Sequence, residues 1–179
     1  MNTSSTLRIS ARLELRPVPW AAVEAIVAGD RLPGWADDFP DAGDQIIARL
    51  LHQGGAEAAE SERTSPWGHY QVVERASGAV VGGAGFKGPP ESGETEIGYN
   101  IVPSRQGRGY ATEAVRTLLA MAWAHPQARS VTASTAPGNV ASQRVLEKAG
   151  FALAATTDEK HYRIHRPADA ALPASSTNS

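Results

Sequence analysis

The sequence of 179 residues contains no cysteine, which excludes disulfides and thiolate catalysis and fits a reducing cytoplasm. Aromatic residues make up only 6% of the chain. The formal net charge is -2, so the excess of basic residues that nucleic-acid binding demands is missing. No apolar run approaches the roughly 20 residues of a membrane span, and the N-terminus lacks the apolar core of a signal peptide. We therefore expect a cytoplasmic protein that binds neither nucleic acid nor membranes.

The length suits one domain with a single hydrophobic core. We assign residues 12–167 to this domain, with residues 1–11 as an N-terminal extension. Residues 168–179 consist mainly of Ala, Pro and Ser with little to bury, so we expect a flexible C-terminal tail.

Strand and helix patterns alternate along the domain. They predict strands at 12–18, 69–75, 79–86, 94–102, 130–135, 151–157 and 161–165, and helices at 20–28, 44–52, 111–124 and 140–149. The helix at 44–52 has an apolar stripe through Ile46, Ile47, Leu50 and Leu51, and the acidic stretch 54–66 is interpreted as a polar loop. A meander of strands followed by β-α-β-α-β units predicts a mixed α/β (α+β) fold.

Two glycines stand immediately before the alanine-rich helix, in the stretch RQGRGYATEA (105–114). The unpaired N–H groups and the dipole of a helix start favour phosphate, and Gly107 and Gly109 let phosphate oxygens approach the backbone. Arg105 and Arg108 add positive charge nearby. Glycines at a helix start also serve tight packing, so this stretch alone leaves phosphate binding and packing both open. It matches neither a P-loop nor a dinucleotide-binding fingerprint.

A wider reading connects this stretch to a second block. EIGYNIVPSRQGRGYATEAV, followed about 25 residues later by NVASQRVLEKAGF, resembles the GNAT superfamily of acetyl-CoA-dependent N-acetyltransferases, especially the Rim-type branch that acetylates ribosomal-protein N-termini. The phosphate-loop pattern of the family, [QR]-x-x-G-x-[GA], falls on Gln106, Gly109 and Ala111. The second block supplies Asn139 and Ser142. The likeness covers about Leu13 to about His165.

The resemblance implies a single GNAT-like domain with a mixed, mostly antiparallel sheet of about seven strands, splayed in the middle and flanked by helices. It also implies acetyl-CoA as co-substrate. The strand end at Ile101 and Val102 would offer backbone groups to the pantetheine arm, Asn139 would hydrogen-bond that arm, and Ser142 would lie near the thioester sulfur. The loop would hold the pyrophosphate through Gln106 and the amides of Gly107, Arg108, Gly109, Tyr110, Ala111 and Thr112. Homodimers are common in the family, so a homodimer is one expected assembly.

Several of these residues also fit a purely structural role. Asn139 precedes a helix and suits an N-cap, a role that is compatible with holding a cofactor. Gly150 and Phe151 read as an ordinary helix stop. Ser142 fits an ordinary helix position, and Arg108 fits a solvated side chain.

The implied reaction is acetyl transfer to a primary amine by direct attack in a ternary complex. The attacking amine must be neutral, so a proton acceptor is needed. Glu94 and Glu96 share one face of the strand at 94–102, and Glu96 is the candidate catalytic base, with a solvent-facing glutamate as the ordinary alternative. Ser142 is the candidate donor to the departing thiolate. Many relatives have a tyrosine where Leu146 stands, so Ser142, a tyrosine from elsewhere, or no acid at all fills that role.

The acceptor remains open at this stage: a protein N-terminus, or a small amine such as a polyamine or an aminoglycoside. The acidic segment 30–44 with Trp35 and Phe39 suits a cationic amine through charge and cation–π contact, or equally a solvated loop anchored by two aromatics. His69 is a candidate for lining the acceptor pocket. The histidines show no metal-ligand spacing, so no metal is expected. The alternative function is a non-catalytic acyl-CoA-binding or assembly module of the same fold.

Overall fold

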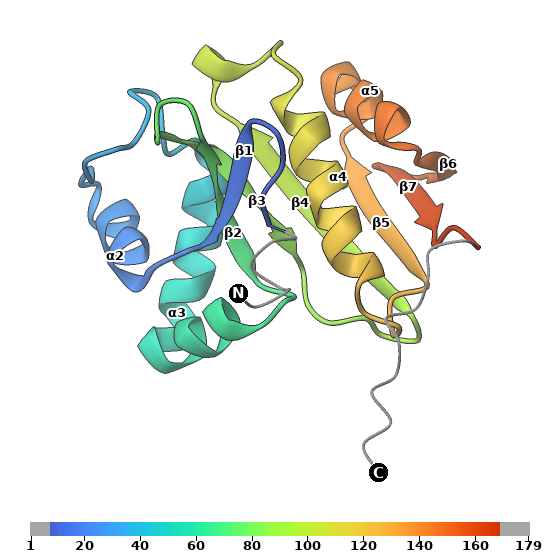
Figure 1. The fold of residues 1–179 in the computed structure, drawn as a ribbon, viewed down its shortest axis with the longest axis horizontal. Helices are drawn as coiled ribbons and strands as arrows, with labels where there is room; N and C mark the ends of the chain where they lie inside the picture. The colour runs from blue at the N-terminus through green and yellow to red at the C-terminus, as the bar shows by residue number, and fades with distance from the viewer. Residues whose placement is uncertain (1–7, 169–179) are drawn as a thin grey trace.

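A seven-stranded sheet in the order β1-β2-β3-β4-β5-β7-β6 organises the protein (Figure 1). The computed structural model describes residues 8–168, so residues 1–7 of the expected extension and 169–179 of the expected tail lie outside the described residues. The strands are β1 (Leu13–Pro17), β2 (His69–Glu74), β3 (Val80–Phe86), β4 (Glu94–Ile101), β5 (Ser130–Thr135), β6 (Ala152–Thr156) and β7 (Lys160–His165). The helices are α2 (Trp20–Ala28), α3 (Ala42–Thr64), α4 (Tyr110–Trp123) and α5 (Val140–Ala149), with a 3-10 turn η1 at Pro103–Arg105.

The sheet consists of two antiparallel halves that meet at one short parallel contact. β1 to β4 pair antiparallel, as do β5, β7 and β6. Between the halves, β4 pairs with β5 only from Glu94–Ser130 to Glu96–Thr132. Beyond Glu96 the rest of β4 has no partner in β5, so the sheet is splayed in its middle as predicted.

Helices cover both faces of this sheet. In Figure 1, α4 crosses in front of the central strands with α5 beside it, while α3 lies behind the sheet and packs against α2. β2 and β3 are buried on both faces and carry core residues such as Val72 and Val81. Among the helices of residues 8–168, none has the length and apolar character needed to cross a membrane.

The expected strands and helices are present within a few residues, but the region after residue 53 is not the predicted loop. α3 continues to Thr64 across a kink at Gly55, which has φ 80° and ψ 170°. The stretch after Gly55 is rich in Ala and Glu, and these good helix formers restart the helix once glycine has turned the chain.

The predicted apolar stripe of α3 is right for Leu51, which is buried, and wrong for Ile46 and Leu50. Ile46 and Leu50 are 63% and 58% exposed, whereas Asp44, Ala48 and Leu51 are buried. The reason lies at the helix start, where the Asp44 side chain accepts hydrogen bonds from Asp41 and Asn100 and so turns its own face of the helix toward the sheet.

Candidate active site

The chain leaves β4 through a turn that depends on glycine. Gly107 and Gly109 adopt the left-handed conformation, with φ 73° and 79°. Side chains other than glycine occupy this region at a cost, so the turn into α4 requires these two residues. A Cβ on Gly107 would meet nothing within 4 Å, which means that the backbone there is open to approach from outside.

The start of α4 offers unpaired hydrogen-bond donors. Within residues 8–168, no amide from Gly107 to Thr112 donates to a protein acceptor. Gly109 provides no side-chain cap, whereas Asp41 caps α3 and Asn139 caps α5. The helix dipole therefore combines with free N–H groups at α4, which is the arrangement that binds phosphate.

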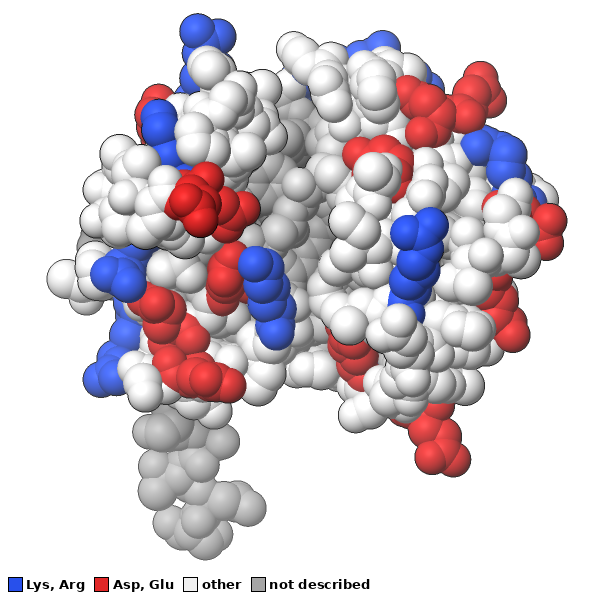
Figure 2. Space-filling model, turned by 180° about the vertical axis from the view of Figure 1, so that it is seen from behind, with Lys and Arg blue, Asp and Glu red and all other residues white. Residues whose placement is uncertain are grey.

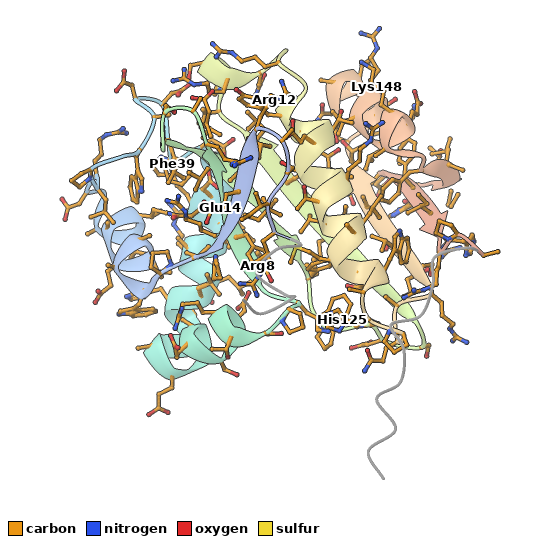
Figure 3. The ribbon with its side chains drawn as sticks, viewed as in Figure 1. Arg8, Arg12, Glu14, Phe39, His125 and Lys148 are labelled. Carbon is orange, nitrogen blue, oxygen red and sulfur yellow. The ribbon has the colours of Figure 1, made fainter. Side chains whose placement is uncertain are left out.

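Arg12 pairs with Glu113, the one acidic residue in the first turn of α4, and neutralises its charge. Its guanidinium lies 2.6 Å from Oε2 of Glu113 and stacks over the Tyr110 ring at 4.8 Å. It also donates to the carbonyl oxygen of Arg108 at 2.8 Å. Figure 3 shows Arg12 between the N-terminal end of β1 and the start of α4. Because Arg12 neutralises Glu113, this carboxylate does not repel an anion bound at the helix start.

A second carboxylate, Glu74, lies buried beneath the same loop. Its oxygens accept hydrogen bonds from the Tyr110 hydroxyl at 2.6 Å and the Ser77 hydroxyl at 2.5 Å. The bonds from Ser77 and Tyr110 lower the pKa of Glu74, so the group is anionic at neutral pH. Arg105 and Arg108 approach it to 3.8 and 3.9 Å, so Glu74 draws both guanidinium groups toward the loop.

Ile101 and Val102, at the end of the splayed strand β4, direct their N–H groups to opposite sides. The Val102 N–H donates to Val81 of β3 at 2.9 Å, so this amide is part of the sheet. Because peptide groups alternate along a strand, the N–H groups of Tyr99 and Ile101 point the other way, toward the opening between β4 and β5. Gln106 does not extend outward: its Nε2 donates to the Ile101 carbonyl oxygen at 2.8 Å and ties the loop to the strand.

The start of α5 brings Asn139, Ser142 and Tyr99 together. The side chain of Asn139 accepts the Ser142 N–H at 3.0 Å, which makes it the N-cap that the sequence allowed. The Ser142 hydroxyl lies 2.8 Å from the hydroxyl of Tyr99 on β4. Burial raises the pKa of Tyr99, so the phenol stays protonated at neutral pH. Leu146 is fully buried, and Gly150 ends the helix in the left-handed conformation as expected.

The two glutamates of β4 are both engaged. Glu94 accepts from Arg163 at 2.8 Å and from Ser130 at 3.0 Å, which ties it into the sheet. Glu96, the predicted base, is paired through Oε1 with Lys87 Nζ at 2.5 Å and remains about one-third exposed.

An apolar pocket of roughly 260 Å³ lies between α3 and the sheet. Its wall is formed by side chains such as Phe39, Ile46 and Leu51, and its floor by the bare backbone of Gly83, Gly85 and Gly98. The face seen in Figure 2 is hollowed along its middle, with an uncharged floor and charged side chains at the rims. Lys87 and His69 also line the pocket, and His69 is paired with Glu62.

Comparison with known families identifies the chain. The family model described as the acetyltransferase (GNAT) domain matches residues 12–152. The protein belongs to the GNAT acetyltransferase family.

Relatives of this GNAT chain are recognisable in sequence and in structure. The N-acetyltransferase YjdG of Bacillus subtilis is 37% identical over 83 residues, which is 46% of this chain and 49% of YjdG. The match thus spans about half the length of that relative. RimL, a ribosomal L7/L12 α-N-protein acetyltransferase solved with coenzyme A, superposes with a TM-score of 0.65 at 20% identity, covering 89% of this chain and 97% of RimL. A GNAT-family acetyltransferase from Bacillus anthracis gives 0.62 at 20% identity, covering 88% and 96%. At these identities the superpositions show the GNAT fold.

The acidic segment before α3 proves to be anchored by its aromatics. Trp35 and Phe39 are buried and meet edge to face at 5.0 Å, so both rings pack into the core. Asp38 accepts from the Ser104 N–H and hydroxyl at 2.8 and 2.7 Å, which joins this segment to η1, the turn before Gly107 and Gly109. The two aromatics therefore anchor this segment, while Phe39 and Asp44 also line the pocket.

Two residues of the site were missed by sequence reasoning. Tyr99 lies on the face of β4 opposite Glu96, and only the fold brings Ser142 to it. Asp44 was treated as one of several loop acids, yet it is 8% exposed and lines the pocket. Its Oδ2 accepts from Asn100 Nδ2 at 2.9 Å, and burial raises the pKa of Asp44 to about 7. Within residues 8–168, no group of three His, Cys, Asp or Glu side chains is placed to hold a metal.

Proposed function

We propose that the protein transfers an acetyl group from acetyl-CoA to a primary amine, by direct attack of the amine in a ternary complex. The observation that carries this proposal is the run of unpaired amides from Gly107 to Thr112, at a helix start beside the opening between β4 and β5. These donors fit a pyrophosphate, and the unpaired edge of β4 fits the amide groups of a pantetheine arm.

In this proposal the chain holds the co-substrate mainly through its backbone. The Gly107–Thr112 amides bind the pyrophosphate, with Arg105 and Arg108 held nearby by Glu74. The Ile101 N–H binds the pantetheine arm, together with the side-chain amide of Asn139, whose oxygen already caps α5. Gln106 stabilises the loop from behind through its bond to the Ile101 carbonyl. Val102 does not bind the co-substrate through its N–H, because that group donates to Val81 of β3; it holds the end of β4 in the sheet.

The bound co-substrate supplies an activated acyl group on sulfur. The chain then has three tasks: to take a proton from the amine, to stabilise negative charge on the carbonyl oxygen, and to donate a proton to the leaving sulfur. A backbone N–H on the splayed part of β4 suits the second task. The Tyr99–Ser142 pair suits the third, because a neutral phenol is a better donor than a serine hydroxyl.

The proton acceptor is a carboxylate on the pocket side of β4. Glu96, the candidate derived from the sequence, borders this side but is paired with Lys87. Asp44 is the second carboxylate there. The acceptor is a small amine or a protein N-terminus, and the likeness to RimL, a ribosomal L7/L12 α-N-protein acetyltransferase, supports the second.

Two measurements test the proposal. Calorimetry with coenzyme A should detect binding, and a thiol-release assay with acetyl-CoA and a panel of amines should detect turnover. The panel should include peptides that begin with Ala, Ser or Met. Absence of coenzyme A binding would refute the whole proposal. Binding without turnover for every amine would instead favour a non-catalytic acyl-CoA-binding or assembly module.

A further inference from the structure

The pocket between α3 and the sheet contains one buried carboxylate with a free oxygen. Among the described residues that line the pocket, Asp44 is the one carboxylate. Its Oδ2 accepts from Asn100 Nδ2 at 2.9 Å and from the Asp41 N–H at 3.1 Å. Within residues 8–168, no group donates a hydrogen bond to its Oδ1. Oδ1 is not among the fully buried unpaired side-chain atoms of these residues, so it is accessible from the pocket and free to accept from a ligand.

The floor of the pocket is shaped around this oxygen. A Cβ added to Gly83 would lie 2.5 Å from Asp44 Oδ1 and 3.1 Å from Asn100 Oδ1. Any side chain at position 83 would therefore press on the carboxylate. The glycine keeps Oδ1 in contact with the space of the pocket.

Asp44 is also placed beside the expected reaction centre. Its partner Asn100 belongs to the part of β4 that has no partner in β5. Asn100 lies between Tyr99, which reaches Ser142, and Ile101, whose N–H points to the opening. An amine bonded to Asp44 Oδ1 would thus lie next to the strand segment that is expected to hold the thioester.

Glu96 is less suited to the same task. Oε1 of Glu96 already accepts a hydrogen bond from Lys87 Nζ, and the Glu96 side chain is partly exposed to water. It also lies on the segment of β4 that still pairs with β5, three residues before Tyr99.

We propose that Asp44 is the catalytic proton acceptor, and that its pocket selects a primary amine attached to an apolar group. This inference rests on the proposed function. Asp44 Oδ1 takes one proton from the ammonium form of the acceptor, and the freed nitrogen lone pair forms the C–N bond. The C–S bond then breaks, and the thiolate leaves with its electron pair. The second proton passes from nitrogen to sulfur through the hydroxyls of Tyr99 and Ser142, and Asp44 releases its proton to solvent.

The raised pKa of Asp44, about 7, supports this role because a base works best when its pKa is near the operating pH. Burial is the main cause of the shift, and the Asn100 hydrogen bond opposes it. The other ionisable groups that line the pocket are His69 and Tyr70 on β2, Lys87 after β3 and Tyr99 on β4. Asp41 at the start of α3 and Glu62, the partner of His69, lie next to these residues.

The walls of the pocket define the class of acceptor. They are formed largely by apolar side chains, and Ile46 extends this apolar surface to the rim, where it is 63% exposed. A polyamine would place a second ammonium in apolar surroundings with the charge of Lys87 nearby. A single amine on an apolar body avoids this, whether it is a small arylalkylamine or a polypeptide whose first residue is apolar.

The test compares three isosteric variants: Asp44→Asn, Glu96→Gln and the control Asp41→Asn. Asp41 carries the same charge three residues away and serves as an N-cap, a role that Asn performs equally well. Thiol release is measured at saturating acetyl-CoA from pH 5.5 to 9 with 2-phenylethylamine, a peptide beginning with Phe, and spermidine. Coenzyme A binding by calorimetry checks that each variant is folded.

With 2-phenylethylamine, an alkylamine that stays largely protonated up to pH 9, the wild type should show kcat/KM rising to a plateau with a break near pH 7. With the Phe peptide the same rise should be followed by a fall as its α-amine, with a pKa of about 7.7–8.0, loses its proton. Asp44→Asn should lose about 100-fold or more in kcat/KM and lose the break, since general bases contribute factors of about 10² to 10⁴. Glu96→Gln should keep the break near pH 7, and Asp41→Asn should keep a break at lower pH, because Asp41 contributes to the raised pKa of Asp44. All three variants should bind coenzyme A like the wild type. 2-Phenylethylamine or the Phe peptide should have a higher kcat/KM than spermidine. Whichever of these two has the higher kcat/KM shows whether the acceptor is a small amine or a polypeptide N-terminus.

The opposite results refute the inference in separable ways. An Asp44→Asn enzyme within threefold of the wild type, or a break removed by Glu96→Gln, overturns the role of Asp44. A preference for spermidine overturns the acceptor class. No thiol release by the wild type with any amine refutes acetyl transfer itself. If Asp44→Asn fails to bind coenzyme A, the variant Gly83→Ala replaces it in the test, because its methyl group presses on Asp44 Oδ1 without changing any charge. In Gly83→Ala, kcat/KM should fall and the break should shift. A pH profile like that of the wild type would refute the role of Asp44.

Discussion

The buried carboxylate of Asp44 should make the protein less stable as the pH rises. Its pKa is raised from 3.8 to about 7, so the ionised form is penalised in the folded state. The associated stability is fully present below the unfolded pKa and is lost as the pH rises through the folded value. At about 1.36 kcal/mol per pKa unit, the full loss is about 4 kcal/mol. Asp44→Asn removes the penalty, because a neutral amide does not ionise.

The assay is urea unfolding of the wild type and Asp44→Asn across this pH window. The unfolding free energy of the variant minus that of the wild type should increase by roughly 3 kcal/mol between pH 5 and pH 8, since part of the effect falls below pH 5. The control Asp41→Asn retains the Asp44 carboxyl, so its difference from the wild type should change less with pH, by the part of the Asp44 pKa shift that Asp41 causes. A pH-independent difference for Asp44→Asn would show that the carboxyl is not held in its protonated form and would refute the reasoning.

Three further predictions concern the co-substrate site. Gly107 and Gly29 both have a positive φ and open space where a Cβ would lie, so Gly107→Ala and the control Gly29→Ala should each lose about 1 kcal/mol of stability. Only Gly107→Ala should weaken coenzyme A binding, by roughly tenfold in calorimetry. Asn139→Asp should keep the thermal stability, because Asp is an equally good N-cap, yet bind coenzyme A less tightly, whereas Asn139→Ala should lose both; equal affinities for the Asp variant and the wild type would remove Asn139 from the site. Tyr99→Phe should slow thiol release about tenfold without changing coenzyme A affinity, and an unchanged rate would exclude the phenol as proton donor.

The phosphate-loop side of the site could be predicted because its signals are local. The glycines at 107 and 109, the helix that follows, and the N-cap at Asn139 all lie within a few residues of the groups they organise. Backbone donors need no particular side chain, so a short pattern describes them well. The family resemblance then fixed how this loop relates to the splayed strand.

The acceptor side could not be predicted in the same way. Asp44 and Asn100 are 56 residues apart, and Tyr99 and Ser142 are 43 apart, so each pair exists only after the sheet has formed. The apolar residues of α3 do not predict its buried face for a related reason. Ile46 and Leu50 suggested the buried stripe, but polar bonds at the helix start determine which face meets the sheet.

The length of α3 was missed because two adjacent glycines, 54 and 55, interrupt an otherwise helical pattern. Glycine next to an acidic stretch favours a loop, and the expectation followed that rule. The structure instead uses Gly55 as a single bend between two helical segments. Helix propensity after the bend, in the Ala and Glu residues, was the better guide.

The glycine floor of the pocket limits how its specificity can change. At Gly83 and Gly85 an added methyl group would come within 2.8 Å or less of neighbouring atoms, and no residue is smaller than glycine. Substitution can therefore only fill this floor and never deepen it. Protein engineers who want a larger acceptor must reshape the helical wall opposite, at positions such as Ile47 and Leu51, and natural divergence faces the same restriction.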